Sequence, residues 1–366
     1  MCLAAPKDFA GFATVRFLLG FSEGAVSPAF VTITSYWYKQ DEHAIRTALW
    51  ISMNALAQIT GSLLMYAIGL HPTPLLAPWR LLFLLCGLLT SASGILFYYL
   101  MPSGPSSAWF LSAREKEILV LRMAAANEGG DRTSFSVAQV REAMGDGKVF
   151  LVFWWGVLVT LQSPVLTFAS LIIKSLNYTP SKTLLYTSPS GALQLLLLAL
   201  GTLLTHLLPK NRCLTTLLLI LPPLTGCILL LLLPPTSSWP IIASSWLASC
   251  ITAPWSILLS LSASNVKGNT KRSVANAVFF IGYCAGCVAG PQLWTRGPRY
   301  FSGVVAAIVA WVMLGVAVCA WWVVCARENR RRDREGVVVV GGGGGGGEGG
   351  DMDLTDKQDR AFRYTW

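Results

Sequence analysis

Charged residues are scarce in this 366-residue chain. Asp, Glu, Lys and Arg together make up 13% of it, against about 25% in an ordinary soluble domain. Hydrophobic residues make up 54%. This balance argues against a conventional soluble domain and indicates a protein that lies in the lipid bilayer.

Catalytic and metal-binding patterns are missing as well. The three histidines, His43, His71 and His206, are scattered in expected loops or near helix ends. The sequence contains no H-E-x-x-H metal motif, no G-x-S-x-G nucleophile motif and no G-x-x-x-x-G-K-[ST] phosphate loop. We therefore expect neither an enzyme nor a protein with a metal or an organic cofactor.

The nine cysteines do not form the framework of a disulfide-rich protein. Eight of them lie in or beside apolar runs, where reduced cysteine is a common packing residue. Cys284 and Cys287 form a C-x-x-C pair, but it falls on an expected membrane helix with no second pair or histidine nearby. Redox or zinc chemistry is therefore disfavoured.

Long apolar runs dominate what is present. Each is about 20 residues long, which is enough to cross a hydrocarbon core about 30 Å thick as an α-helix. We expect nine spans, over residues 10–36, 48–70, 79–101, 149–173, 184–208, 213–233, 239–263, 274–294 and 302–325.

The net charge of +10 follows the expected topology. If the spans alternate, one side of the membrane receives 21 of the 28 Lys and Arg residues, the other side receives six, and Arg16 lies within a span. The positive-inside rule makes the richer side cytosolic. The basic excess therefore needs no nucleic-acid partner, and we expect a multi-pass protein with a cytosolic C-terminus.

The distribution of polar residues predicts four regions. Residues 102–148 are polar, and Ser112 and Glu115 have the spacing of a capping box at the start of a surface helix. The C-terminal region combines a basic run with a glycine-rich stretch, which is typical of a tether without fixed structure. The regions are an N-terminal half-bundle (1–101), a cytosolic linker (102–148), a six-helix half (149–325) and a disordered cytosolic tail (326–366).

Several long stretches resemble the fungal allantoate permease group of the anion:cation symporters, in the major facilitator superfamily. They include "RFLLGFSEGAVSPAF", "SYWYKQDEHAIRTALW", "ASNVKGNTKRSVANAVFFIGYCAGCVAGPQLW" and "DLTDKQDRAFRY". The resemblance implies an all-α membrane protein with twelve helices in two six-helix halves. The alignment starts at the end of the third family helix, so we expect nine helices, with the first three of the twelve missing. The N-terminal half-bundle is then incomplete and holds family helices 4 to 6.

Arg16 and Glu23 are the most unusual residues within the spans. Seven positions apart, they share one helix face to within about 20° and lie roughly 10.5 Å apart along the axis. A charge at the bilayer centre costs at least about 2.5–3.5 kcal/mol, so each needs water, a partner or a substrate. We interpret Arg16 as an anion clamp, since its planar fork suits a carboxylate. Glu23 is the candidate proton carrier, and the family resemblance implies the same pair of roles.

Other readings of these two residues remain open. Arg16 is near the start of its span and can reach the outer headgroups, while Glu23 can have a structural role. Uncharged polar residues in the spans are further candidates for substrate binding, with interhelical hydrogen bonding as the alternative. They are Asn54, Gln58, Thr160, Gln162, Ser188, Ser190, Gln194, Asn276 and Tyr283.

The resemblance implies proton-coupled symport of a small organic anion, such as allantoate or a related ureido acid, by alternating access. The proton is the coupling ion and no cofactor is expected. Nicotinate or pantothenate are alternative substrates. A second alternative is a truncated membrane remnant that does not transport. We expect a monomer in the plasma membrane.

Overall fold

The computed structural model describes residues 2–39, 42–70, 76–125, 135–208, 211–234, 238–295, 297, 300–335 and 354–366. Within these ranges the chain is helical, with turns and extended connections and no strand. Nine helical segments among the described residues are long and apolar enough to cross a membrane. This confirms the prediction of an all-α membrane protein with nine spans.

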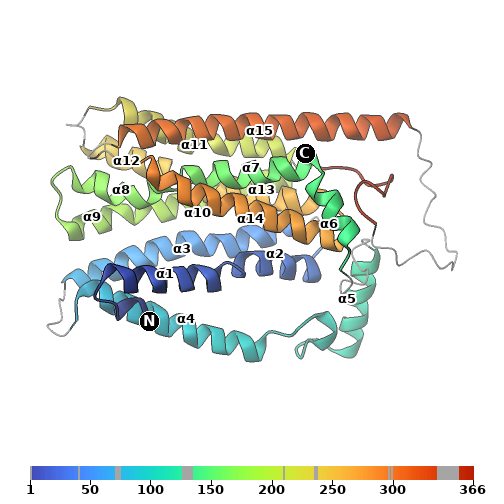
Figure 1. The fold of residues 1–366 in the computed structure, drawn as a ribbon, viewed down its shortest axis with the longest axis horizontal. Helices are drawn as coiled ribbons and strands as arrows, with labels where there is room; N and C mark the ends of the chain where they lie inside the picture. The colour runs from blue at the N-terminus through green and yellow to red at the C-terminus, as the bar shows by residue number, and fades with distance from the viewer. Residues whose placement is uncertain are drawn as a thin grey trace.

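Fifteen α-helices make up the described fold (Figure 1). They are α1 (Phe9–Glu23), α2 (Val26–Trp37), α3 (His43–Leu70), α4 (Pro78–Leu100), α5 (Ala113–Ala125), α6 (Val137–Met144), α7 (Gly147–Leu161), α8 (Pro164–Lys174), α9 (Pro180–Thr187), α10 (Pro189–Leu207), α11 (Arg212–Leu232), α12 (Ser238–Ala248), α13 (Thr252–Asn265), α14 (Asn269–Gln292) and α15 (Phe301–Arg334).

Four of the nine spans consist of two consecutive helices, and each break precedes or surrounds a proline. The breaks separate α1 from α2, α7 from α8, α9 from α10 and α12 from α13. Proline has no N–H to donate, and its ring clashes with the carbonyl four residues earlier. Pro28, Pro164, Pro189 and Pro254 therefore interrupt the backbone ladder within otherwise apolar runs.

The core lies in the C-terminal half of the chain. Helix α13 is buried along its whole length, whereas α1 and α4 contain no buried residue. Figure 1 shows α7 to α15 as one bundle, with α1 to α3 along one side of it and α4 at the outside. The rings of Trp155 on α7 and Trp321 on α15 are fully buried, with centroids 4.6 Å apart.

Glycines allow α7 and α14 to pack with their backbones almost in contact. A Cβ atom added at Gly282 would lie 2.2 Å from the carbonyl oxygen of Phe153, and one at Gly156 would lie 2.2 Å from that of Phe279. Small residues permit such approach between membrane helices. The pair α7–α14 is therefore held at a separation that larger residues cannot reach.

The polar linker contains the surface helix that its sequence predicts. At the start of α5, the Ser112 backbone N–H donates to Glu115 Oε2 at 2.8 Å, and the Glu115 N–H donates to Ser112 Oγ at 3.3 Å. The two side chains thus cap the helix reciprocally. Arg122 on α5 also pairs with Glu42 at 2.6 Å, which ties the linker to the start of α3.

The expectation of a disordered tail over 326–366 is wrong for two described parts of it. Helix α15 continues through the basic run to Arg334, and residues 354–366 lie against the helix bundle. Tyr364 is only 3% exposed. The reason is that polar residues of 354–366 find specific partners on the bundle, described below. The glycine-rich stretch, 336–353, lies outside the described residues.

We expect Gly282→Ala to destabilise the fold, because its methyl group must displace the backbone of α7. Overpacking of this kind costs about 1–3 kcal/mol or more. Thermal unfolding of the detergent-solubilised protein measures it. The matched control is Gly94→Ala on α4, where an added Cβ meets no atom within 4 Å. Equal unfolding temperatures for the two variants would contradict the packing argument.

Candidate functional site

A cavity of about 300 Å³ lies between α3 and the C-terminal half-bundle. Its walls come from α3, α7, α8, α10, α13 and α14 and from the breaks within two of the spans. The lining residues are Asn54, Ala57, Gln58, Val159, Thr160, Ser163, Leu166, Gln194, Ser249, Ile251, Thr252, Trp255 and Tyr283. Five sequence-predicted residues, Asn54, Gln58, Thr160, Gln194 and Tyr283, are therefore brought together.

Two of the broken spans open onto this cavity. Ser163 lies at the break between α7 and α8, and Ser249 and Ile251 lie at the break between α12 and α13. Irregular backbone at membrane depth is tolerated where it is buried in protein or borders a water-filled space. The breaks therefore combine with the polar side chains to make this the polar centre of the bundle.

A close approach of α10 to α3 sets one wall of the cavity. A Cβ atom at Gly191 would lie 2.6 Å from the carbonyl oxygen of Ala55. Gln194 is one turn further along α10, and Asn54 and Gln58 flank the contact on α3. The glycine therefore brings three amide side chains from two helices to one space.

The opposite wall is fixed by a hydrogen bond between α7 and α14. Thr160 Oγ1 lies 2.7 Å from the carbonyl oxygen of Gly156 on its own helix and 2.9 Å from that of Tyr283. A hydroxyl has one proton to donate, so these two carbonyls share it. Thr160 thus joins the two helices in addition to lining the cavity, and it positions Tyr283.

Three donors on residues of the cavity wall have no hydrogen-bond partner within the described part of the chain. They are Gln194 Nε2, Thr252 Oγ1 and Trp255 Nε1, and each atom is buried. An unpaired buried donor costs about 1–3 kcal/mol. The three atoms belong to α10 and α13 and are closed off from the cavity as it stands, so a ligand rich in acceptor oxygens, or ordered water, reaches them only after a shift of these side chains.

No charged side chain lines the described cavity, and Arg16 and Glu23 are both exposed on α1. The Arg16 guanidinium lies over the rings of Phe12 and Phe83, 5.3 and 5.9 Å from their centroids. Glu23 is the last residue of α1. The structure thus leaves Arg16 beside α4 and brings neither charge into the lining of the described cavity. Their roles remain predictions.

The other four predicted site residues do not line the described cavity. Gln162 is fully buried and donates to the carbonyl of Val159, and Ser190 donates to that of Thr187. Ser188 is the residue at the break between α9 and α10. Asn276 is buried on α14. The break before Pro189 does not border the cavity, whereas the breaks before Pro164 and Pro254 do.

Sequence reasoning missed four polar residues of the wall, namely Ser163, Ser249, Thr252 and Trp255. The sequence does mark their positions by nearby prolines, since Ser163 directly precedes Pro164 and the other three lie within five residues of Pro254. Proline within an apolar run marks a break in the helix. Which break faces a cavity depends on the packing of the spans against one another.

A second polar site lies at the end of the bundle that carries α5, α6 and the C-terminal segment 354–366 (Figure 1). Lys271 at the start of α14 has a side chain only 1% exposed, and it pairs with three carboxylates. Its Nζ lies 2.6 Å from Asp356, 2.8 Å from Glu142 and 2.9 Å from Asp146. A buried charge is stable only when it is paired and hydrogen-bonded.

Two further lysines balance the charge of this cluster. Lys148 on α7 pairs with Asp356 at 2.7 Å, and Lys357 lies 3.4 Å from Asp146. Lys148, Lys271 and Lys357 thus offset the charges of Glu142, Asp146 and Asp356. The cluster joins α6, α7 and α14 to residues 354–366, which the sequence alone did not reveal.

Side chains of α13 and α15 hold the C-terminal segment through its backbone. Asn329 donates to the carbonyl of Tyr364 at 2.9 Å and accepts from its N–H at 3.0 Å. Asn265 accepts from the N–H of Thr365 at 2.7 Å. Arg332 donates to the carbonyls of Asp356, Asp359 and Phe362. These bonds dock the segment in one orientation.

The acidic residues of the cluster have perturbed proton affinities. Burial acts to raise the pKa of Asp356, but the charges and hydrogen bonds of Lys148, Lys271 and Tyr364 outweigh it, so its pKa is lowered. At Asp146 burial also acts to raise the pKa. The charges and hydrogen bonds of Lys148 and Lys271 outweigh this effect, so the pKa of Asp146 is lowered as well. Both groups therefore favour the docked segment while they are ionised.

We expect docking of residues 354–366 to be stable at neutral pH and to be lost in acid. A lowered folded-state pKa stabilises the docked form above the unfolded value of about 3.9, and this contribution disappears as the pH falls through the folded value. Hydrogen exchange of the C-terminal peptide, corrected for its intrinsic pH dependence, measures docking.

The matched variants for this measurement are Asp356→Asn and Asp333→Asn. Asp356 is buried in the cluster, whereas the side chain of Asp333 is 64% exposed and pairs with Arg363 of the segment at the surface, where an ion pair contributes only about 0–1 kcal/mol. We expect protection at neutral pH to fall in the first variant and to persist in the second. Undiminished protection in Asp356→Asn would show that the ion pairs do not hold the segment.

The chain is similar to fungal membrane transporters over its whole length. It is 32% identical to an uncharacterized transporter of Schizosaccharomyces pombe, over 100% of this chain and 70% of that protein. It is 31% identical to an MFS-type transporter of Penicillium expansum, over 93% of this chain and 70% of the relative. It is 29% identical to the allantoate permease of Saccharomyces cerevisiae, over 89% and 62%.

A family comparison gives the same result. Residues 1–291 match the model of the Major Facilitator Superfamily. The similar proteins are named as transporters, which confirms that the chain is a multi-pass membrane protein of a transporter class and not an enzyme. The chain spans 62–70% of the length of these three relatives. With nine candidate spans among its described residues and a family match over residues 1–291, it belongs to the major facilitator superfamily.

Proposed function

We propose that the chain takes part in proton-coupled transport of a small organic anion, of the ureido acid class to which allantoate belongs. The observation that carries the proposal is the polar lining of the cavity, in which Gln194, Thr252 and Trp255 have buried donor atoms without a hydrogen-bond partner among the described residues. A ligand with carboxylate and carbonyl oxygens supplies the acceptors that these donors lack. The similarity to an allantoate permease supports the same class.

The position of the cavity fits a transport mechanism. It lies between α3 and the C-terminal half, where a substrate can be reached alternately from the two sides as the halves rock about it. Gln194 and Trp255 belong to the C-terminal half, and Asn54 and Gln58 belong to α3. A ligand held by both sides links occupancy of the site to their relative position.

Glu23 is the proposed proton carrier, and Arg16 the proposed anion clamp. Glu23 is the last residue of α1, and the following helix α2 packs against α14, which carries Tyr283 of the cavity wall. Arg16 lies two turns from Glu23 on the same helix. In this proposal its long side chain leaves the rings of Phe12 and Phe83 when an anion is bound.

The proposed setting is the plasma membrane, with a monomeric chain and its C-terminus in the cytosol. The basic end of α15, α5, α6 and the segment 354–366 gather at one end of the bundle (Figure 1). Segments rich in lysine and arginine stay on the cytosolic side. The distribution of charge in the folded chain thus supports one orientation.

Uptake of radiolabelled allantoate by yeast cells that lack their own permease tests the substrate class. We expect uptake that rises as the external pH falls, because the proton enters with the anion. Nicotinate and pantothenate are measured in parallel. Uptake of either one without allantoate would replace the proposed substrate, and no uptake by correctly inserted protein would support the non-transporting alternative.

We expect Gln194→Leu to lower uptake about tenfold or more, because a hydrogen bond to a charged ligand contributes about 1.5–3 kcal/mol. The control is Gln162→Leu, which removes an equally buried amide that does not line the cavity. Membrane abundance is measured for both. Equal uptake by the two variants would remove the cavity from the proposed mechanism.

We expect Glu23→Gln to abolish the dependence of uptake on pH, since glutamine cannot carry the proton. Glu117→Gln on the exposed face of α5 is the control and should retain it. Arg16→Ala should raise the KM for the anion. Normal transport by both the Glu23 and Arg16 variants would refute these two role assignments but would leave the family assignment unchanged.

A further inference from the structure

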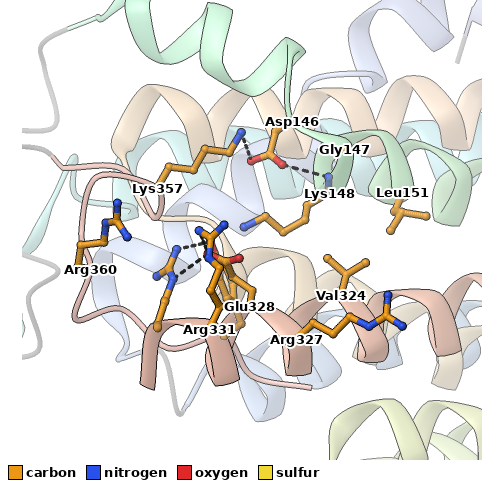
Figure 2. A pocket seen from close by; sticks show the side chains of 12 residues that line it. Asp146, Gly147, Lys148, Leu151, Val324, Arg327, Glu328, Arg331, Lys357 and Arg360 are labelled. Atoms are coloured by element: carbon orange, nitrogen blue, oxygen red, sulfur yellow. Dashed lines mark hydrogen bonds and ion pairs between the residues drawn. The ribbon is translucent and has the colours of Figure 1, made fainter. Parts of the chain in front are cut away.

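A second and larger cavity, of about 700 Å³, lies at the end of the bundle where α7, α15 and the C-terminal segment 354–366 meet (Figure 2). It shares no lining residue with the central cavity. Six basic residues border it, against two acidic ones, Asp146 and Glu328. The basic residues are Lys148, Arg327, Arg331, Arg332, Lys357 and Arg360.

The ion pairs of these basic residues differ in how far they are exposed to solvent. The side chains of Lys148 and Arg332 are 12% and 3% exposed. Lys148 pairs with Asp356 of the docking cluster, and Arg332 pairs with Glu328 and donates to carbonyls of the C-terminal segment. The side chains of Arg331 and Arg360 are 61% and 57% exposed and pair with Glu328 and Glu335 at the surface. Exposed pairs contribute about 0–1 kcal/mol, so an anion can take over these side chains.

Arg327 has no ion pair within the described part of the chain, and it is exposed. Figure 2 shows it beside Val324, at the edge of the cavity away from Lys357 and Arg360. The cavity therefore offers a cation without a partner and two loosely held arginines. Arginine forks match the oxygens of phosphate in paired hydrogen bonds.

The apolar part of the lining gives the orientation of the ligand. Leu151 and Val324 border the cavity and belong to the membrane-spanning parts of α7 and α15. Arg327 and Arg331 follow Val324 by one and two turns. The cavity therefore joins an apolar stretch of α7 and α15 to a basic stretch of α15, and a ligand that fills it has an apolar and an anionic part.

We propose that this cavity binds the phosphorylated headgroup of an anionic phospholipid, with Arg327 and Arg331 as phosphate ligands and Leu151 and Val324 against the start of its acyl chains. Lys357 and Arg360 come from the C-terminal segment, whereas Arg327 and Arg331 come from α15. A headgroup bound among them bridges the segment and the bundle. The bound lipid thereby strengthens the docking of residues 354–366.

The experiment uses the full chain in nanodiscs of phosphatidylcholine with or without phosphatidylinositol 4,5-bisphosphate. Native mass spectrometry measures retained lipid, and hydrogen exchange measures protection of 354–366. We expect the wild-type chain to retain the phosphoinositide and to gain protection from it. Soluble inositol 1,4,5-trisphosphate, which has the same phosphate groups without acyl chains, should neither bind at similar concentration nor add protection.

The test variant is the double substitution Arg327→Gln with Arg331→Gln, and the matched control is Arg330→Gln with Arg334→Gln. The control removes the same charge from the same helix at exposed positions that do not line the cavity. We expect the test variant to retain about tenfold less lipid, since each basic residue near an anionic surface contributes appreciably to binding. The control should match the wild type.

Three outcomes would overturn the proposal. Equal loss in both double variants would show attraction by net charge without a site. Equal binding of the soluble trisphosphate would assign the cavity to a free phosphate compound instead of a lipid. No retention of phosphoinositide by wild-type protein whose thermal unfolding is normal would remove the site altogether.

Discussion

The structure depends on one constraint, which is that a polar group removed from water must find a partner. In the hydrocarbon core each unsatisfied backbone or side-chain group costs several kcal/mol. The chain satisfies this constraint by pairing. Lys271 is buried among three carboxylates, and the Thr160 hydroxyl reaches the carbonyls of two helices. The exceptions are therefore informative, and three of them are on the wall of the central cavity.

The same constraint explains where the helices are interrupted. Prolines break four spans, and the breaks at Pro164 and Pro254 border the cavity. On the other side of the wall, glycines bring α7 and α14 so close that their backbones touch. The close packing of α7 and α14 makes that part of the wall firm, whereas the breaks before Pro164 and Pro254 leave backbone that can rearrange. A transporter that alternates between two states needs both properties.

Residues 354–366 connect several helices at one end of the bundle. They contact α6, α7, α13, α14 and α15 through the lysine–carboxylate cluster, two asparagines and Arg332. Helices joined at one end in this way move as a unit more readily than singly. The basic cavity lies at the same junction, between the basic end of α15 and this segment.

The sequence by itself determined the class of the protein and much of its local structure. Apolar runs of membrane length predicted the nine spans, the Ser112–Glu115 spacing predicted the cap of α5, and long motifs predicted the superfamily. These features depend on residues close together in the chain, where hydropathy and backbone sterics act locally. Five of the predicted polar residues also proved to line the cavity, because polar groups within apolar runs have few other places to go.

Only the tertiary structure decided which polar residues meet. Gln162 and Gln194 are both glutamines within apolar runs. The contact of Gly191 with α3 places Gln194 at the cavity, whereas Gln162 does not line it. A basic run beside a glycine-rich stretch predicts a tail without fixed structure, whereas the charged partners that dock residues 354–366 are distant in the sequence. Asp356 finds Lys148 and Lys271 more than 80 residues away. Pairing of buried charges is a long-range interaction, so it becomes visible only when the helices are assembled.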